Sequence, residues 1–357
     1  MTRFNVKKSN FGCGWETSFR KISSTYDNPP TAATDFDWKI FTNELDLTDG
    51  KPTMERDQQH YVGTDSRLPT YTFEGAYKNG ELSFDGNLRH AHVLNAIFGS
   101  CVSTTTASST VNQHTISIGD RKSFFTYFLH SNGTTNHLQA LIGCKADEVT
   151  IDATEKEPVK VSLKALVAKA VTCATTYALN SSSKALDPTV AYYHWKHSAV
   201  DLKIGGVTYT SSTQNQVEKW KITYKNNTEY KWGAPSTGGQ LHASYDKDGM
   251  FDAEIVLTLY PEDTKLWQLS PHEATYAEKS SSSSVSLTIT LNRIAAESNV
   301  DQIAFVFSDL AVMKVSEPIK EIKDNISPVE VTLKPARNSS TVYVLAYDPC
   351  EIASYTG

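Results

Sequence analysis

Residues 78–99 read KNGELSFDGNLRHAHVLNAIFG, in which a turn signal precedes a short alternating strand and an apolar run that ends at a glycine. The dipeptide Asn79-Gly80 favours the positive backbone dihedrals of a type I′ turn, and apolar and polar residues alternate on both sides of it. We therefore predict a β-hairpin with strands at 70–77 and 80–85.

The second part of this stretch has the spacing of a helix. Leu94, Ile97 and Phe98 recur at helical intervals and form an apolar stripe. We expect Asn87 to cap the first turn and Gly99 to occupy the left-handed position after the last turn. Because so short a helix is marginal alone in water, its stripe must pack on a sheet.

The composition of the 357-residue chain indicates a globular protein rich in strands. Hydrophobic residues make up 39% of the chain and aromatic residues 10%, with abundant Thr, Ser, Val and Tyr. The formal net charge of -6 argues against a dedicated nucleic-acid binder, which normally carries a basic domain or stripe.

Cysteine usage and the N-terminus bear on the compartment of the protein. The five cysteines, at positions 13, 101, 144, 173 and 350, show no close pairing, so we expect reduced thiols. The N-terminal MTRFNVKKSNFGCGW lacks the apolar region of a signal peptide, and no stretch approaches transmembrane length. We expect a protein made in a cytoplasm and not inserted in a membrane.

Two segments of the first half of the chain are echoed in the second. PVKVSLKA at 158–165 resembles PVEVTLKP at 328–335, at an offset of 170. Lys78-Asn79-Gly80 resembles Lys247-Asp248-Gly249, at an offset of 169. A period this long indicates a duplicated domain rather than a solenoid or propeller unit.

We predict two related β-rich domains, at 1–180 and 188–357, joined by the polar stretch 180–187. Each contains strands, long loops and one short helix, whose packing residues are expected to be Leu94, Ile97 and Phe98 in the first domain and Leu266 and Trp267 in the second. Beyond the hairpin, strands are expected at 112–118, 123–130, 145–152, 158–170, 199–210, 216–225, 250–260, 285–293, 301–315, 328–334 and 341–347.

The stronger catalytic signatures are absent from the sequence, which has no G-x-S-x-G elbow, no Gly-rich phosphate loop and no H-E-x-x-H motif. His90 and His92 diverge on the predicted helix and have no acidic or thiol ligand beside them. His194 and His197 lie among aromatic residues and are interpreted as structural histidines.

The clustered carboxylates also have ordinary interpretations. Asp246, Asp248 and Glu254 lack the spacing of a calcium-binding loop, and we interpret them as charges at a hairpin tip. Glu155 and Glu157 lie in a polar loop, where solvated charge is the default. We therefore predict no enzyme activity, no cofactor and no metal site.

The order of these features resembles the tail tube proteins of long-tailed phages and related archaeal viruses. The resemblance is clearest from Phe11 to about Ala170, and looser in the second half. It begins with an N-terminal arm, Gly12 to Phe19, and continues through the hairpin and helix ending LNAIFG. Further similar segments are Lys122 to Phe128, Leu141 to Ile151 and Pro158 to Lys169.

The resemblance implies a mainly β fold with two duplicated β-sandwich or barrel domains, each with a short flanking helix. It implies a structural protein of the virion, the major tail tube subunit, whose stacked rings form the channel for genome delivery. A chain with two tube domains would close a ring as a trimer with pseudo-sixfold symmetry, and a hexamer is the alternative. An acidic balance suits a conduit, because basic residues would bind the passing DNA through counterion release.

Several partners and sites follow from the same resemblance. The subunit would contact itself, the tape measure protein and the tail terminator and tip proteins, would let viral DNA pass without specific binding, and would assemble in the host cytoplasm. Phe11, Trp15 and Phe19 are expected to belong to an arm that contacts the adjacent ring. Residues 1–30 and about 48–69 are expected to become ordered against that ring.

Two other functions remain open from the sequence. A carbohydrate-binding or receptor-binding tail adhesin would also be β-rich, with Tyr230 and Trp232 stacking on sugars. A β-sandwich glycosidase would need two carboxylates that converge in a cleft, which a sequence alone does not show.

Overall fold

The computed structural model describes residues 10–21, 38–39, 42–46, 53–59, 71–105, 111–131, 136–173, 191–210, 215–232, 245–263, 265–269, 285–293, 301–316, 328–336, 340–348 and 355. In this part the chain is mainly β. The elements are β1 (Asn10–Trp15), β2 (Trp38–Lys39), β3 (Thr42–Asp46), β4 (Thr53–Gln59), β5 (Tyr71–Lys78), β6 (Gly80–Asn87), α1 (His92–Phe98), β7 (Gly99–Thr105), β8 (Asn112–Ile118), β9 (Phe124–Ser131), β10 (Asn136–Thr154), β11 (Lys160–Cys173), η3 (Trp195–His197), β12 (Ser198–Ile204), β13 (Val207–Thr208), β14 (Val217–Lys225), β15 (Glu229–Lys231), β16 (Tyr245–Lys247), β17 (Asp252–Leu259), α2 (Lys265–Leu269), β18 (Val285–Asn292), β19 (Gln302–Val315), β20 (Val329–Pro335) and β21 (Val342–Asp348).

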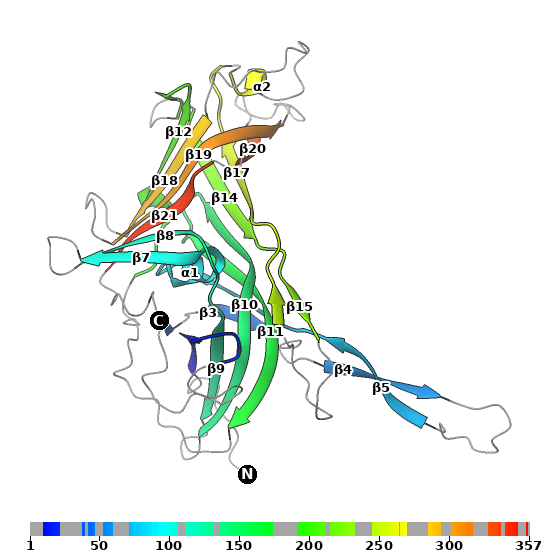
Figure 1. The fold of residues 1–357 in the computed structure, drawn as a ribbon. Helices are drawn as coiled ribbons and strands as arrows, with labels where there is room; N and C mark the ends of the chain where they lie inside the picture. Colours follow the sequence, from blue (N-terminus) through cyan, green and yellow to red (C-terminus); the bar gives the residue numbers. More distant parts are fainter. Residues whose placement is uncertain are drawn as a thin grey trace.

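One long antiparallel sheet crosses the molecule, in the order β3-β6-β11-β10-β14-β17-β20-β19 (Figure 1). Two branches leave it. From β10 the sheet continues to β9 and β1. From β19 it continues to β18 and β12 on one edge, and to β21, β8 and β7 on the other.

The strands of the first half follow the order β1-β9-β10-β11-β6-β3, and those of the second half follow β12-β18-β19-β20-β17-β14. The echoed segments lie at corresponding places in the two orders. Leu163 pairs with Phe84 and Leu333 pairs with Ile255, so the offset is 170 in one strand and 171 in its partner.

The predicted hairpin at Asn79-Gly80 is wrong. β5 pairs with β4, whereas β6 pairs with β11 and β3, so the chain passes through Asn79 from one sheet into another without reversing. Neither Asn79 nor Gly80 is among the described residues with positive φ. The alternation identified both strands, but a local dipeptide carries no information about which distant strand becomes the partner.

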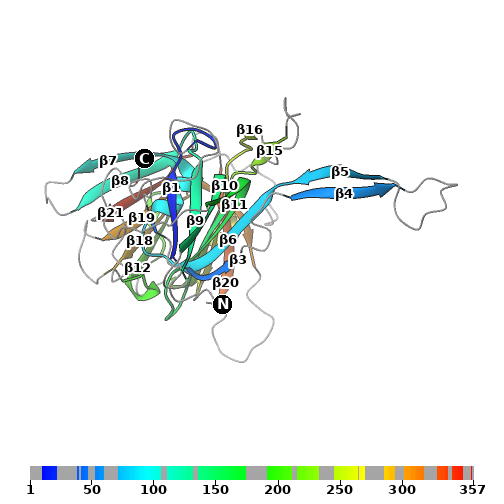
Figure 2. The ribbon, with the colours of Figure 1, turned by 90° about the horizontal axis from the view of Figure 1, so that it is seen from below.

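Two-stranded arms leave the long sheet at matching places in both halves. β4 and β5 continue β3 and β6 outward as a long ribbon (Figure 2). β15 and β16 stand in the same relation to β14 and β17, but each has only three residues. The second turn signal, at Lys247-Asp248-Gly249, therefore also lies where an arm strand gives way to a sheet strand.

Helix α1 lies where the apolar stripe predicts it, but its start differs from the prediction. Asn87 is the last residue of β6, and Ala91 precedes the helix without a side-chain cap. Gly99 ends the helix with φ of 94°, as expected. A Cβ at this glycine would lie 2.8 Å from the backbone of Arg121, so both conformation and space require glycine.

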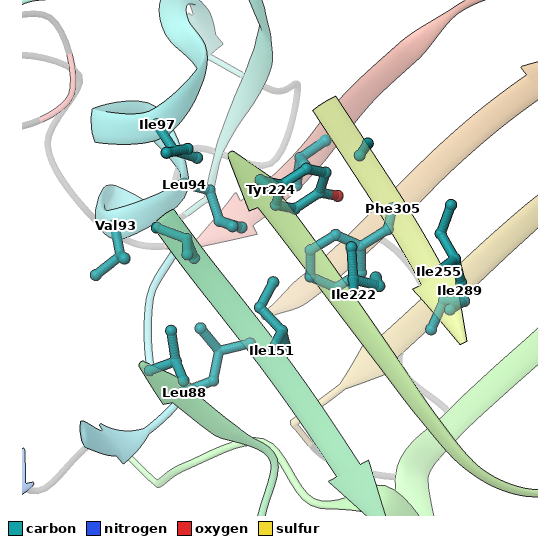
Figure 3. Close-up of a cluster of buried hydrophobic side chains, with 14 of the residues drawn as sticks. Leu88, Val93, Leu94, Ile97, Ile151, Ile222, Tyr224, Ile255, Ile289 and Phe305 are labelled. Carbon is teal, nitrogen blue, oxygen red and sulfur yellow. The ribbon is translucent and has the colours of Figure 1, made fainter. Parts of the chain in front are cut away.

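The hydrophobic core is continuous across the predicted domain boundary. Figure 3 shows Leu94 and Ile97 of α1 near Ile151 of β10, with Ile222 and Tyr224 of β14 beside them. One cluster of buried apolar side chains includes residues of both halves. The predicted join at 180–187 lies outside the described residues.

Candidate assembly interface

The two halves of the chain are joined edge to edge where β10 meets β14. In this register Thr150 faces Thr223, with 3.5 Å between their hydroxyl oxygens. Glu148 pairs with Lys225 across the same junction, at 3.1 Å between carboxylate and ammonium. Ile151 and Ile222 also pair, and both are fully buried. The junction therefore has an apolar face and a charge-complementary face.

A buried polar cluster fixes the base of the short β15–β16 arm to the first half. Arg121 is 4% exposed and binds the Asp248 carboxylate through Nη2, and its Nη1 donates to the Ala146 carbonyl at 2.6 Å. Lys145 binds Asp246 and lies 3.5 Å from Asp248. These two cations bind Asp246 and Asp248, which the sequence analysis placed at a hairpin tip, whereas Glu254 lies in β17, 3.3 Å from the Lys334 ammonium.

Backbone contacts complete this anchor. The Asn226 side-chain amide donates to the Ile97 carbonyl at 2.8 Å, which ties the end of β14 to α1. The Asp147 carboxylate accepts the Thr228 N–H at 2.7 Å. A Cβ at Gly249 would lie 2.4 Å from the Asn227 carbonyl oxygen, so the chain passes too closely there for another residue.

The exposed face of the long sheet carries interleaved charges of both signs. Acidic residues occupy β6, β10 and β17, lysines occupy β11, β14 and β19, and β20 carries both Glu330 and Lys334. Ion pairs link neighbouring strands, such as Lys164 with Glu148 at 3.6 Å and Lys334 with Asp252 at 2.9 Å. The residues on this face are Glu81, Asp85, Glu148, Asp152, Asp252, Glu254, Lys160, Lys164, Lys219, Lys221, Lys225 and Lys314.

The N-terminal segment is held against its own subunit over residues 10–21. β1 pairs with β9, and Trp15 is buried against Phe124 with ring centroids 6.4 Å apart. Phe19 packs edge-on against Tyr230 of the short arm at 5.4 Å. The side chain of Phe11 and residues 1–9 lie outside the described part, so an inter-ring role for this segment stays a prediction.

Glu16 is the buried carboxylate of this segment. It accepts hydrogen bonds from the Ser123 hydroxyl and from the N–H groups of Gly143, at 2.7 Å, and Arg20, at 2.8 Å. Burial raises the pKa of Glu16 to about 7, although these hydrogen bonds favour the ionised form. Glu16 therefore holds the bulge of β10, where Gly143 has φ of 66°.

A second polar cluster covers α1 from the C-terminal end of the chain. Tyr355 stacks between His92 and His114, each at 3.9 Å between ring centroids, and its hydroxyl donates to Asp348 at 2.6 Å. The same carboxylate lies 3.3 Å from His114 Nε2, whose Nδ1 is 2.8 Å from the Ser103 hydroxyl oxygen. Burial lowers the pKa of His92 to about 3.

The Ser103–His114–Asp348 chain has the order of a hydrolytic triad, but its surroundings favour a structural role. His114 is fully buried and Tyr355 covers one face of its ring. A working triad needs an accessible nucleophile beside groups that stabilise an oxyanion. We interpret the cluster as a structural one that holds Tyr355 against α1. The Asn95 side chain of α1 also donates to the Tyr355 carbonyl at 2.6 Å.

The helix-packing residues occupy the following positions. Leu94 and Ile97 are fully buried and Phe98 is 1% exposed, with its ring 4.9 Å from that of Tyr224. In the second half Leu266 is fully buried, and Trp267 is half-buried at the edge of the same core.

The remaining candidate residues have structural partners. Tyr230 is 5% exposed and donates its hydroxyl to the Gly143 carbonyl, so its ring is not presented for stacking on a sugar. Trp232 is half-buried and donates to the Asn79 side chain at 3.0 Å. His194 accepts the Lys196 N–H at 3.1 Å in the η3 turn.

Among the described residues, no group of three or more His, Cys, Asp and Glu side chains is arranged to hold a metal ion. Cys13, Cys101 and Cys144 are not in disulfide bonds. No described helix has the length and apolar character needed to span a membrane.

Comparison with known protein families gives a match that spans most of the sheet described above. A family model described as phage tail tube protein matches residues 14–329, which include strands of both halves from β3 to β19. The chain belongs to this family. It is therefore a structural tail tube protein and a component of the virion. A search of curated proteins gives no match.

Sequence reasoning missed the residues that fix the tail tube fold over long range. Arg121 and Asp248 are 127 positions apart, and nothing in the local sequence of either indicates the other. Glu16 had a detectable signal, because it is a lone acid between Trp15 and Phe19 in an otherwise apolar and small-residue segment.

Proposed function

We propose that this chain is the major tail tube subunit, whose rings stack to form the channel for genome delivery. The observation that carries the proposal is that two sheets of the same strand order are already joined edge to edge within one chain. An edge-to-edge joint that repeats by rotation closes a ring. With two such units in each chain, three copies give a pseudo-sixfold ring, and a hexamer of chains is the alternative.

The charged face of the long sheet is proposed to line the channel. Its acids and lysines are interleaved and partly paired, as for Glu148 between Lys164 and Lys225. A wall with few unpaired cations releases few counterions when DNA enters, so DNA passes without being held. The helices and the apolar core lie on the other face of the sheet.

The subunit's further partners are proposed from its place in a tail. These are the next ring, the tape measure protein inside the tube, and the terminator and tip proteins at its ends, with assembly in the host cytoplasm. The long β4–β5 arm projects from the body of the subunit and is the described element best placed to reach another ring (Figure 2).

The purified protein tests the proposal directly. Sedimentation velocity over a range of concentrations, followed by negative-stain microscopy, should show rings or hollow tubes. Native mass spectrometry of the smallest ring then separates three copies from six. A species that stays monomeric at high concentration, and that forms no tubes on a tail-tip complex, would overturn the proposal. Binding to a glycan array by that monomer would favour the adhesin instead.

A further inference from the structure

Two strand edges at opposite ends of the long sheet have no partner among the described residues. β3 pairs through one edge only, with β6. β19 pairs with β18 as far as Leu310, and beyond that point, over residues 311–315, it pairs only with β20. Unpaired N–H and C=O groups along an edge are a template for another strand.

The joint between β10 and β14 shows what occupies such an edge. β10 pairs with β9 as far as Cys144 and then, along the same edge, with β14 from Glu148 onward. In the strand orders of the two halves, β19 occupies the same position as β10, and β14 occupies the same position as β3. The free part of β19 therefore corresponds to the part of β10 that binds β14.

The registers convert this correspondence into residue pairs. Thr150 pairs with Ser162, and Lys314 pairs with Thr332, which is the echo of Ser162 at the offset of 170. Lys314 therefore corresponds to Thr150, and by the same step Val315 corresponds to Ile151.

The other strand is placed in the same way. Ile222 pairs with Ile255 and Leu45 pairs with Phe84, and these partners correspond at the offset of 171. Leu45 thus corresponds to Ile222, and Asp46 corresponds to Thr223.

We propose that β19 of one copy pairs antiparallel with β3 of a second copy, with Val315 opposite Leu45 and Lys314 opposite Asp46. The inference rests on the proposed function, and it names the strands and the register that close the ring. It makes the joint between chains a repetition of the joint within the chain.

Charge supports this partner. Within the chain the acidic strand β10, with Glu148 and Asp152, meets the basic strand β14. In the proposed joint between chains the signs of charge are exchanged, since β19 carries the exposed Lys314 and the sequence of β3 contains Glu44 and Asp46. Met313, the bulge residue beside Lys314, is 47% exposed and would be covered by a neighbouring strand. Opposite charges facing each other across strands stabilise pairing, whereas like charges oppose it.

Cysteine cross-linking tests the register. The variant Lys314→Cys with Asp46→Cys, oxidised after assembly, should give covalently linked dimers and trimers on a non-reducing gel. The matched control is Thr150→Cys with Thr223→Cys, which should lose its added thiols without gaining mass, because that bond forms within one chain. A second control, Lys314→Cys with Glu44→Cys, shifts the register by two residues and should give little linkage. The unsubstituted protein measures linkage through its own cysteines.

Charge reversal gives a second readout that does not depend on disulfide geometry. Lys314→Glu should raise the critical concentration for ring formation several-fold, and adding Asp46→Lys should restore it. Rings that form by microscopy but show no Lys314–Asp46 linkage and no rescue would overturn this pairing and leave the proposed function standing. Failure of the unsubstituted protein to form rings would overturn both.

Discussion

The two halves of the chain share one strand order but differ in everything attached to it. The first half has the long arm β4–β5, the fully buried helix α1 and an unbroken β11 of 14 residues. The second has an arm of three-residue strands and the five-residue helix α2. It also has two strands, β20 and β21, along one edge of β19, whereas the single strand β11 covers the corresponding edge of β10. The shared part is the sheet in which β10 and β14 join the two halves. Helix α1 packs against that joint through Phe98 and Tyr224, whereas the long arm β4–β5 projects away from it (Figure 2).

The difference indicates a division of tasks between the halves. Matching sheets allow the same joint to repeat around a ring. The long arm exists in one half only, so a trimer would present three of them, at alternate positions. Contacts between rings would then follow threefold symmetry while the wall of the channel stays close to sixfold.

Removal of the long arm should have the largest effect on assembly. Replacing residues 53–78 with a short Gly-Ser linker should leave the fold and the ring intact but abolish stacking into tubes, because among the described strands β4 and β5 pair only with each other. Circular dichroism and thermal unfolding check the fold, and microscopy counts tubes against single rings. The matched control replaces 233–244, between the short arm strands, and should leave stacking unchanged. Normal tubes from the first variant would show that the arm does not join rings.

The two helices should differ in what they contribute to stability. Phe98 is 1% exposed and contacts Tyr224 across the halves, so Phe98→Ala should cost about 3 to 5 kcal/mol of unfolding free energy. Trp267 is only partly buried in α2, and Trp267→Ala should cost less than Phe98→Ala. Urea unfolding of both variants measures the difference. An equal or larger loss at Trp267 would contradict the contrast between α1 and α2.

Much of the sheet was predictable from the sequence, and its partners were not. Alternation over 217–225 or 285–292 marks a strand with one buried face, and the observed strands agree with those positions. Gly99 was predictable because only the left-handed conformation fits there. The partner of β6, by contrast, is β11, whose paired residues lie 73 (Lys160 with Asn87) to 87 (Val167 with Gly80) positions away, and a turn dipeptide reports nothing about it.

The candidate interface was predictable only in part, for the same reason. The echoes at 158–165 and 328–335 revealed that the chain has two comparable parts. The edge that joins them depends on where β9 stops pairing with β10, which is at Cys144 opposite Phe124, the first residue of β9, so that β14 pairs from Glu148 onward. β7 was missed because its sequence, GSCVSTT, has no clear alternation of apolar residues.

The contributions of the two β-bulges to stability, one in each half, should differ in their dependence on pH. In the first, the Gly143 N–H donates to Glu16. The second-half bulge lies in β19 at Asp309, which has φ of 54° and lies between the β18-paired residues Phe307 and Leu310; its carbonyl accepts hydrogen bonds from the Ala336 N–H at 2.9 Å and the Ser340 hydroxyl at 3.0 Å. The raised pKa of Glu16, about 7 against 4.5, means that the folded state binds the proton more tightly. This stabilisation is complete below about pH 4.5 and is lost as the pH rises to 7.

His92 acts in the opposite direction. Its pKa is lowered from 6.5 to about 3, so stability is retained above pH 6.5 and falls as the pH decreases toward 3. Glu16→Gln should remove the opposing Glu16 contribution and make stability rise more steeply between pH 4.5 and 7. Ser340→Ala, the matched change in the second half, should alter stability by a similar amount at every pH. Urea midpoints measured across this range check both, and a Glu16→Gln slope equal to that of the unsubstituted protein would refute the assignment.

The smallest effect on stability is expected at the base of the short arm, where substitutions of two neighbouring residues, Lys247 and Asp248, can be compared. Lys247 is exposed, so Lys247→Ala should change the unfolding free energy by less than about 0.5 kcal/mol. Asp248 is next in the chain, but its carboxylate neutralises the buried Arg121, and Asp248→Ala leaves that charge with a polar carbonyl and a hydroxyl only. Because Asp248 is itself 41% exposed and water can reach the vacated space, the expected cost is about 1 to 2 kcal/mol rather than that of a fully buried pair. Adding Arg121→Met to Asp248→Ala should recover part of the loss, and a double variant as unstable as the sum of the single changes would show that the ion pair does not hold the halves together.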